Sequence, residues 1–136
     1  MDLERIKKQL MDHEGYGPKV YEDTVGILTI GYGRNLEGKG ITEAEAEYLL
    51  VNDIREVENE LKERLPFFEN LSSIRQEILI DMGYNLGCKG LMNFRRMLAA
   101  LEDEDYELAA DEMLDSKWAT QVKGRARDLA QLMWEE

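Results

Sequence analysis

The sequence predicts an α+β protein in which a small β lobe and a larger helical lobe are joined by a long helix. Glycine predicts the β lobe, since seven of the 11 glycines lie between residues 15 and 40 and such a density favours turns over helix. Apolar residues that recur at helical spacing from residue 42 onwards predict the helical lobe. The length, 136 residues, suits one domain with its own core. We expect a single domain over residues 1–136. It would comprise a β lobe at about 14–41, a connecting helix at about 42–64, and a helical lobe at 66–136 that includes the N-terminal helix. We expect a ligand cleft between the two lobes.

The first 33 residues predict one helix and a small hairpin or meander. A helix over residues 2–13 follows from apolar residues at helical spacing, and Gly15 ends it. Residues 19–24 and 27–32 are rich in β-branched and aromatic side chains and flank a turn at Val25-Gly26. The apolar face of the predicted helix consists of Leu3, Ile6, Leu10 and Met11.

The rest of the chain predicts helices. Thr42 and Glu45 have the spacing of a capping box, which opens a long helix that Pro66 ends. Its apolar stripe comprises Leu50, Ile54, Val57, Leu61 and Leu65. Further helices are predicted over residues 71–86, closed by Gly87, and over 91–101, 104–115 and 122–134.

Composition excludes several classes of protein. With 17 basic and 29 acidic residues the net charge is −12, which disfavours binding to nucleic acid and to anionic membrane surfaces. One cysteine, Cys88, cannot form an internal disulfide, and we expect it to be a small buried side chain. One histidine, His13, excludes a multi-histidine metal site. We therefore expect no metal site built on cysteine or histidine and no stable membrane association.

Two acidic residues and a threonine are the candidates for chemistry. Glu14 lies at the end of the first predicted helix, Asp23 at the tip of the hairpin and Thr29 in the following strand. Two carboxylates held on a helix end and a hairpin suit glycoside hydrolysis, in which one protonates the leaving oxygen and the other handles water or positive charge. Spacing alone is not specific, because a helix-end glutamate, a turn aspartate and a strand threonine are common structural residues.

The segment that contains these residues resembles the signature of phage-type lysozymes, the endolysins of glycoside hydrolase family 24. The matching motifs are Glu14-Gly15, Tyr21-x-Asp23-Thr24-x-Gly26 and Thr29-Ile30-Gly31-Tyr32-Gly33. The similarity continues through Ile41-Thr42-x-x-Glu45, through Gln76-x-x-Leu79-x-x-Met82-x-Tyr84-Asn85-x-Gly87, and through Ser116-Lys117-Trp118 and Gly124-Arg125-Ala126. It covers roughly residues 8–135.

The resemblance implies roles for the matching residues. Glu14 would be the general acid, Asp23 would activate water or stabilise positive charge on the sugar, and Thr29 would help to position that water. Arg125 falls where the family has an arginine that pairs with the catalytic glutamate. Tyr84 and Asn85 would contact saccharide, with packing or capping of the central helix as the alternative for both.

The sequence departs from the family in three respects. Arg34 stands where the family often has a histidine that acts as a structural partner. The stretch between Gly33 and Thr42 is short, which implies a trimmed β lobe and fewer sugar subsites. The negative net charge contrasts with the basic character of family members, so that we expect wall affinity to depend on salt.

The function implied is that of an inverting muramidase, which hydrolyses the β-1,4 bond between N-acetylmuramic acid and N-acetylglucosamine in peptidoglycan and lyses the cell wall. It would act as a monomer on peptidoglycan glycan strands, with no cofactor and no metal. Charges interrupt the apolar residues of the N-terminus, so we expect no signal peptide, and a protein that stays in the host bacterial cytoplasm until its release to the wall. The alternatives are a lytic transglycosylase and a non-catalytic peptidoglycan-binding module on the same fold.

Overall fold

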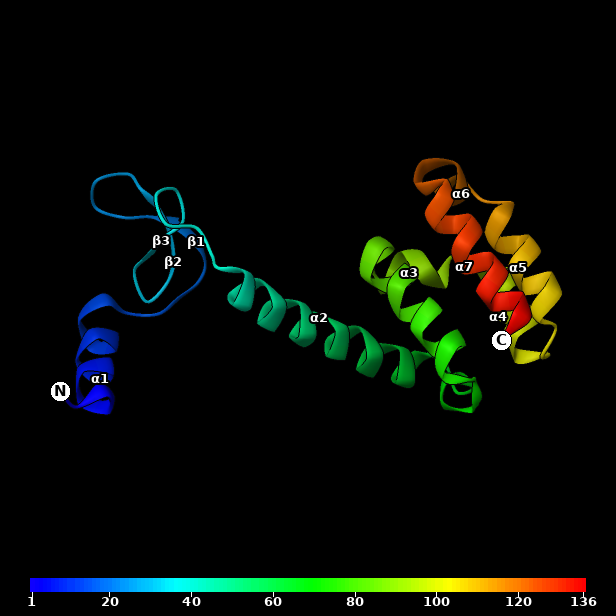
Figure 1. Cartoon of the computed structure of the whole chain (residues 1–136), viewed down its shortest axis with the longest axis horizontal. Helices are drawn as coiled ribbons and strands as arrows, with labels where there is room; N and C mark the ends of the chain where they lie inside the picture. Colours follow the sequence, from blue (N-terminus) through cyan, green and yellow to red (C-terminus); the bar gives the residue numbers. More distant parts are fainter. The chain divides into compact units, whose positions relative to one another are not determined.

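A computed structural model describes all 136 residues and confirms the α+β fold (Figure 1). The chain divides into two compact units, Met1–Leu49 and Leu50–Glu136. Two expectations concern the relation between these units and stay predictions. One is that the N-terminal helix belongs to the helical lobe, and the other is that a ligand cleft lies between the lobes. None of the helices is long and apolar enough to span a bilayer.

The first unit contains a helix and a three-stranded antiparallel sheet. Helix α1 is Leu3–Glu14, β1 is Gly17–Glu22, β2 is Leu28–Gly31 and β3 is Arg34–Asn35, and the strands lie in the order β1-β2-β3. The meander is therefore confirmed, with Asp23-Thr24 in the turn rather than in the first strand. The two-residue strand β3 was not predicted, because a pair of polar residues has no alternation to detect.

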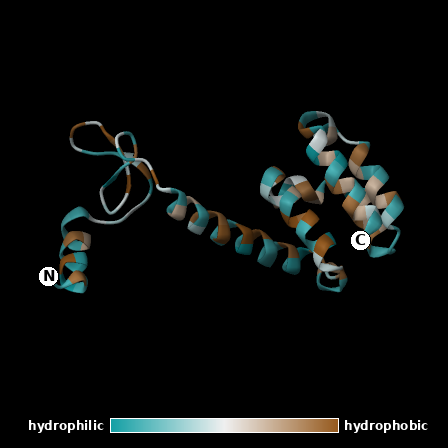
Figure 2. Ribbon diagram, viewed as in Figure 1, coloured by the Kyte–Doolittle hydropathy of each residue, from teal (hydrophilic) through white to brown (hydrophobic).

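The capping box at the start of α2 is confirmed. Helix α2, Glu43–Arg64, begins in the first unit and continues into the second. The backbone N–H of Thr42 donates to Oε1 of Glu45 at 2.8 Å, and the backbone N–H of Glu45 donates to Oγ1 of Thr42 at 3.2 Å. Hydrophobic residues recur along the helix (Figure 2). Leu61 near its C-terminal end and Leu65 directly after the helix are buried, whereas Leu50 and Ile54 are exposed.

The second unit is helical throughout after α2. A short 3-10 helix, η1 (Phe68–Asn70), is followed by α3 (Ser73–Met92), α4 (Arg95–Glu102), α5 (Tyr106–Leu114), α6 (Lys117–Val122) and α7 (Gly124–Glu135). Gly87 has φ +77° and ψ 153° and interrupts α3, so the predicted helix end at this glycine corresponds to a kink. Helix α6 was not predicted. Ser116 caps it by accepting from the backbone N–H of Ala119 at 3.1 Å.

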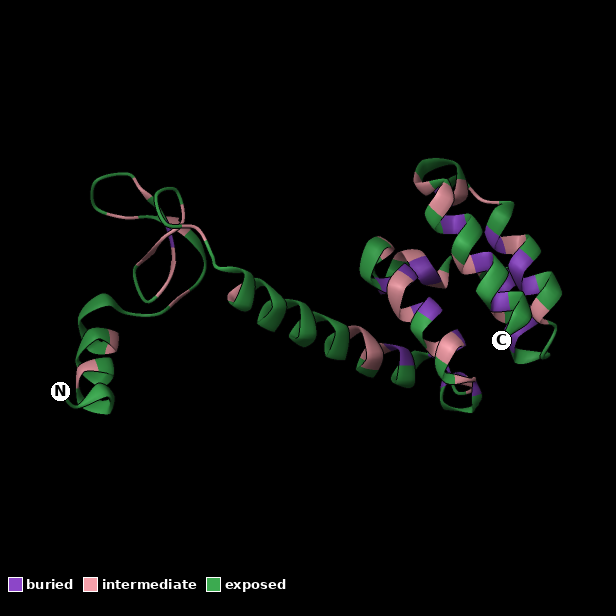
Figure 3. Cartoon of the chain, in the orientation of Figure 1, coloured by how far each residue is buried: buried purple, intermediate pink, exposed green.

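The hydrophobic core lies in the second unit. Helices α5 and α7 run side by side there (Figure 1), and small side chains allow the close approach. Buried residues are concentrated in this unit, whereas in the first unit Thr29 is the one buried residue (Figure 3). The largest fully buried side chains are those of Phe68, Leu61, Ile78, Leu79, Met82, Leu91, Met97, Leu101, Met113 and Met133.

Arg75 is a buried cation that joins three helices. It is 7% exposed, its Nε donates to the carbonyl of Met133 at 2.9 Å, and Nη2 donates to the carbonyl of Trp134 at 3.4 Å. Its guanidinium carbon lies 3.5 Å from the centre of the Tyr106 ring. The carbonyls at the C-terminal end of α7 carry partial negative charge, and the ring face attracts a cation. These groups compensate a buried charge that has no carboxylate partner.

We expect Arg75→Met to destabilise the second unit by about 3 kcal/mol, because it removes hydrogen bonds from a charged donor and a desolvated cation–π contact. Chemical denaturation followed by tryptophan fluorescence measures the change. Arg55→Met is the matched control, because Arg55 is exposed on α2. Equal midpoints for the two variants would contradict a stabilising role for Arg75.

Candidate functional site

Glu14 ends α1, and its carboxylate makes no hydrogen bond or ion pair within the first unit. Gly15, with φ +72°, terminates the helix. The glutamate is exposed and lies against Gly33, because a Cβ built on that glycine would come within 2.7 Å of Oε2 of Glu14. The turn after β2 and the end of α1 therefore meet at this carboxylate. Within the first unit, no group competes with a substrate for this carboxylate.

Asp23 forms the turn between β1 and β2 with one of its two carboxylate oxygens. Oδ1 accepts from the backbone N–H of Val25 and from that of Ile27, both at 2.9 Å. The backbone N–H of Asp23 in turn donates to the carbonyl of Ile27 at 2.9 Å. Oδ2 makes no hydrogen bond within the protein, so the side chain holds the turn and still has an oxygen free to accept a proton.

Thr29 is bound to the same turn. It is 3% exposed, and its hydroxyl donates to the carbonyl of Ile27 at 2.8 Å. Asp23 and Thr29 thus hold the Ile27 backbone from its N–H and its carbonyl sides. Because the hydroxyl hydrogen is committed to Ile27, a water molecule at Thr29 would have to be the donor. The predicted water-positioning role stays a prediction.

Arg34 links β3 to the start of α2. Its Nη1 donates to Oε2 of Glu45 at 2.8 Å, Nη2 donates to Oε1 at 2.6 Å, and Nε donates to the carbonyl of Gly40 at 3.1 Å. The backbone hydrogen bond from Thr42 and then the pairing with Arg34 lower the pKa of Glu45 from 4.5 to about 2. The sequence indicated Glu45 as a capping residue and placed Arg34 where the family often has a histidine that acts as a structural partner. The pairing between them was not predicted, because no local pattern joins residues 11 apart outside one helix.

Arg125 and Tyr84 line one pocket of the second unit. This pocket, of about 300 Å³, is lined by Leu50, Ile54, Glu77, Ile80, Asp81, Tyr84 and Arg125. Tyr84 is 48% exposed. Arg125 donates from Nε and Nη2 to Oδ1 of Asp81, at 2.8 and 2.5 Å. The sequence did not indicate Asp81, which is 44 residues away from its partner, and the predicted pairing of Arg125 with Glu14 stays a prediction.

Asn85 has a structural partner in the same unit. Its Oδ1 accepts from the indole N–H of Trp118 at 2.8 Å. Trp118 is buried and meets the Phe94 ring edge to face, with centroids 6.0 Å apart. This hydrogen bond corresponds to the packing alternative for Asn85 and leaves the amide NH₂ group free.

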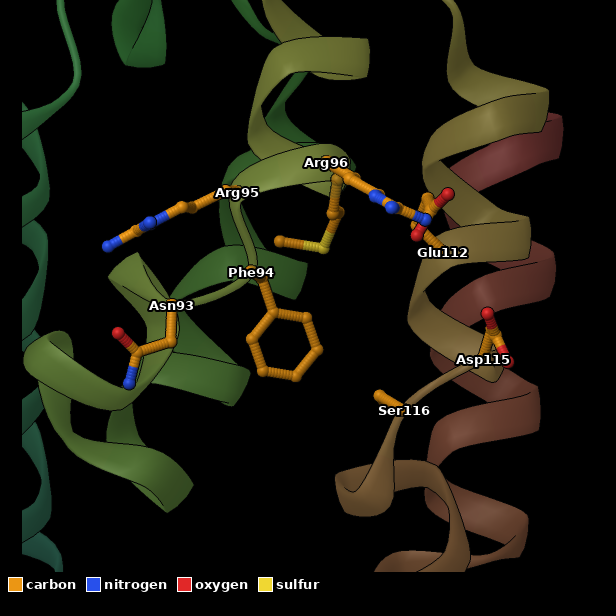
Figure 4. A pocket seen from close by; sticks show the side chains of 8 residues that line it. Asn93, Phe94, Arg95, Arg96, Glu112, Asp115 and Ser116 are labelled. Carbon is orange, nitrogen blue, oxygen red and sulfur yellow. The ribbon is translucent and has the colours of Figure 1, made fainter.

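Another pocket, of about 330 Å³, lies where α4 begins and α5 ends (Figure 4). Phe94 lies within it and Arg96 extends toward Glu112 (Figure 4). None of the residues predicted for the site lines this pocket, so its size alone does not connect it with the chemistry.

Cys88 is a buried thiol, as predicted. It is 7% exposed. Burial, followed by a hydrogen bond with Glu60, raises the pKa of the Cys88 thiol to about 11. The thiol is therefore protonated at neutral pH and is not a nucleophile.

A glutamate at a helix end beside a small sheet, followed by a helical unit, defines a lysozyme-like α+β protein. Residues 11–133 match the phage lysozyme family, and the chain belongs to that family.

Three relatives illustrate the match. The chain is 27% identical to the probable T4-type lysozyme 1 of Dictyostelium discoideum, over 89% of this chain and 88% of the relative. It is 31% identical to the SAR-endolysin of Bacteriophage PS119, over 74% of this chain and 60% of the relative. It is 30% identical to the pre-baseplate central spike protein Gp5 of Enterobacteria phage T4, over 89% of this chain but only 26% of the relative.

The alignments also show that this chain is shorter than the matching parts of its relatives. The alignment with the T4-type lysozyme extends over 150 residues, and the alignment with the spike protein extends over 149 residues. Both lengths exceed the 136 residues of the chain. The relatives therefore contain segments that this chain lacks. The placement of the missing segments in the β lobe stays a prediction.

The turn at Asp23 can be tested separately from any catalytic role. Asp23→Asn keeps an oxygen that accepts from Val25 and Ile27, so we expect unchanged thermal stability of the sheet. Asp23→Ala removes that acceptor and should destabilise the sheet by about 1 kcal/mol. Amide NMR signals of residues 17–35, followed against temperature, measure both effects, and equal stability of the two variants would argue against the turn-holding role.

The lowered pKa of Glu45 predicts a pH dependence of stability. A carboxyl group with a depressed folded-state pKa stabilises the fold above its ordinary pKa of 4.5 and loses that contribution as the pH falls toward 2. The first unit of the wild type should therefore lose stability between about pH 5 and about pH 2 more steeply than that of Glu45→Gln. The same NMR signals, recorded as melting curves at several pH values, measure the slope. Parallel slopes would show that the Arg34–Glu45 pair does not stabilise the unit.

Proposed function

We propose that this protein hydrolyses the β-1,4 bond between N-acetylmuramic acid and N-acetylglucosamine in bacterial peptidoglycan. The observation that carries the proposal is that the first unit of this phage lysozyme family member presents two carboxyl groups with oxygens that have no partner within that unit. Glu14 has no partner in its unit, and Asp23 has a free Oδ2. Glycoside hydrolysis needs one carboxyl group as the acid and another as the base, and these two groups have the chemistry for those roles.

In the proposed reaction, Glu14 gives its proton to the glycosidic oxygen as the bond to the anomeric carbon of N-acetylmuramic acid breaks. Water attacks that carbon from the opposite face and inverts it. Oδ2 of Asp23 accepts the proton that the water loses, while Oδ1 stays bound to the turn. Thr29 accepts a hydrogen bond from the same water through Oγ1, because its own hydrogen is bound to Ile27. No metal or cofactor takes part.

We further propose that the helical unit contributes to substrate binding. Tyr84 presents an exposed aromatic ring in a pocket that Arg125 also lines, and aromatic rings pack against the apolar faces of sugars. Asn85 would offer its NH₂ group, which has no partner within the second unit, while its oxygen accepts from Trp118. The monomer would act on wall glycan strands after release from the host cytoplasm, as a phage endolysin does.

Mass spectrometry of muropeptides released from purified peptidoglycan tests the proposal. The wild type should release products with reducing-end N-acetylmuramic acid. Glu14→Gln should keep the fold and reduce product release by at least about 100-fold, because the amide cannot protonate the leaving oxygen. Asp23→Asn should cost less, since other polar groups can orient the water.

Other products would point elsewhere. Anhydro-muramic acid ends from the wild type would identify a lytic transglycosylase. Binding of folded wild-type protein to peptidoglycan without any product, over a range of salt and pH, would identify a binding module. Full activity of folded Glu14→Gln would contradict the role of Glu14.

A further inference from the structure

The carboxylate of Glu14 lies close to the position that a side chain on residue 33 would occupy. A Cβ built on Gly33 would come 2.7 Å from Oε2, 3.0 Å from Cδ and 3.3 Å from Cγ of Glu14. Real Cβ atoms essentially never approach a heavy atom to within 3.0 Å. The glutamate can therefore occupy this position only because residue 33 has no side chain.

This demand for space distinguishes Gly33 from the other glycines with positive φ. Six glycines have φ between +62° and +84°, and Gly33 is at +77°. Around Gly15, Gly26, Gly31 and Gly87 nothing lies within 4 Å of a built Cβ. Backbone conformation alone explains a glycine at those positions. At Gly33 the backbone conformation favours glycine, and a Cβ would in addition displace the end of the Glu14 side chain.

Two sets of contacts hold the turn that contains Gly33. The residue after Gly33 is Arg34, whose guanidinium donates two hydrogen bonds to Glu45 and one to the carbonyl of Gly40. The residue before Gly33 is Tyr32, whose ring centroid lies 5.5 Å from that of Tyr16, two residues beyond Glu14. The turn that contains Gly33 is thus tied to the start of α2 on one side and to the end of α1 on the other.

We propose that Gly33 is a positioning residue for the general acid, and that the Arg34–Glu45 pair keeps it in place. The inference rests on the proposed function of Glu14. Gly33 limits how close the carboxylate lies to the turn, and Arg34 and Glu45 fix that turn relative to α2. A proton donor must lie within hydrogen-bond reach of the glycosidic oxygen, and a displacement of about 1 Å can cost about 100-fold in rate.

Gly33→Ala tests the proposal directly. The added methyl group displaces the carboxylate, so we expect kcat on soluble peptidoglycan fragments to fall about 100-fold with little change in KM. Gly87→Ala is the control, because it places an alanine at the same φ of +77° with open space around it. It should lose thermal stability through backbone strain and keep the kcat of the wild type.

A crystal structure of Gly33→Ala gives a readout that does not depend on activity. We expect the Glu14 carboxylate to have moved away from residue 33. A folded Gly33→Ala with wild-type kcat, or with the carboxylate unmoved, would overturn the inference while leaving the proposed hydrolysis intact. Absence of muropeptide products from the wild type would instead overturn the proposed function.

Glu45→Gln tests the second half of the proposal and stands in if Gly33→Ala does not fold. Glutamine keeps an oxygen for the backbone N–H of Thr42 but loses the two-oxygen ion pair with Arg34. We expect a lower kcat with KM retained. Glu43→Gln removes the same charge from an exposed position in the first turn of α2 and should behave as the wild type. Equal kcat for Glu45→Gln and Glu43→Gln would show that the pair does not position the acid.

Discussion

The first unit buries no apolar side chain, and its structure depends on hydrogen bonds from a few polar groups. Thr29 is its one buried residue. Asp23 and Thr29 hold the Ile27 backbone from both sides, and Arg34 and Glu45 hold the last strand against the start of α2. A small unit without a core gains little from hydrophobic burial. Each of these polar contacts therefore matters more here than a comparable contact would in the second unit.

The same groups shape the candidate site, so stability and chemistry share residues in this unit. Asp23 uses one oxygen for the turn and leaves the other free. Thr29 commits its hydrogen to the turn and keeps its lone pairs. Glu14, in contrast, contributes nothing that the structure shows to the stability of its unit. A side chain that makes no stabilising hydrogen bond in its unit can be replaced without unfolding that unit. Glu14→Gln therefore tests the chemical role of the residue separately from stability.

Sequence predicted well where the determinants are local. The capping box of Thr42 and Glu45 and the helix end at Gly15 follow from neighbouring residues, and the structure confirms them. The predicted end at Gly87 is a kink, beyond which α3 continues to Met92. The pairs Arg34–Glu45 and Arg125–Asp81 join residues 11 and 44 apart, and no periodicity or spacing indicates them. The closeness of Gly33 to Glu14 could not be predicted from the sequence for the same reason, since it depends on how the end of a helix meets a turn.

The choice of arginine at position 34 has a consequence for the site. The resemblance to phage-type lysozymes leads one to expect histidine there, and a histidine loses its charge near neutral pH. Arginine stays charged throughout the physiological range and matches a carboxylate with two parallel hydrogen bonds. Hydrogen bonds from the Thr42 backbone and from Arg34 lower the pKa of Glu45 to about 2, so its carboxylate is ionised at mildly acidic and neutral pH. The contact that holds the Gly33 turn is therefore insensitive to pH over the range in which a histidine would switch, and a change in activity across that range must originate in other groups.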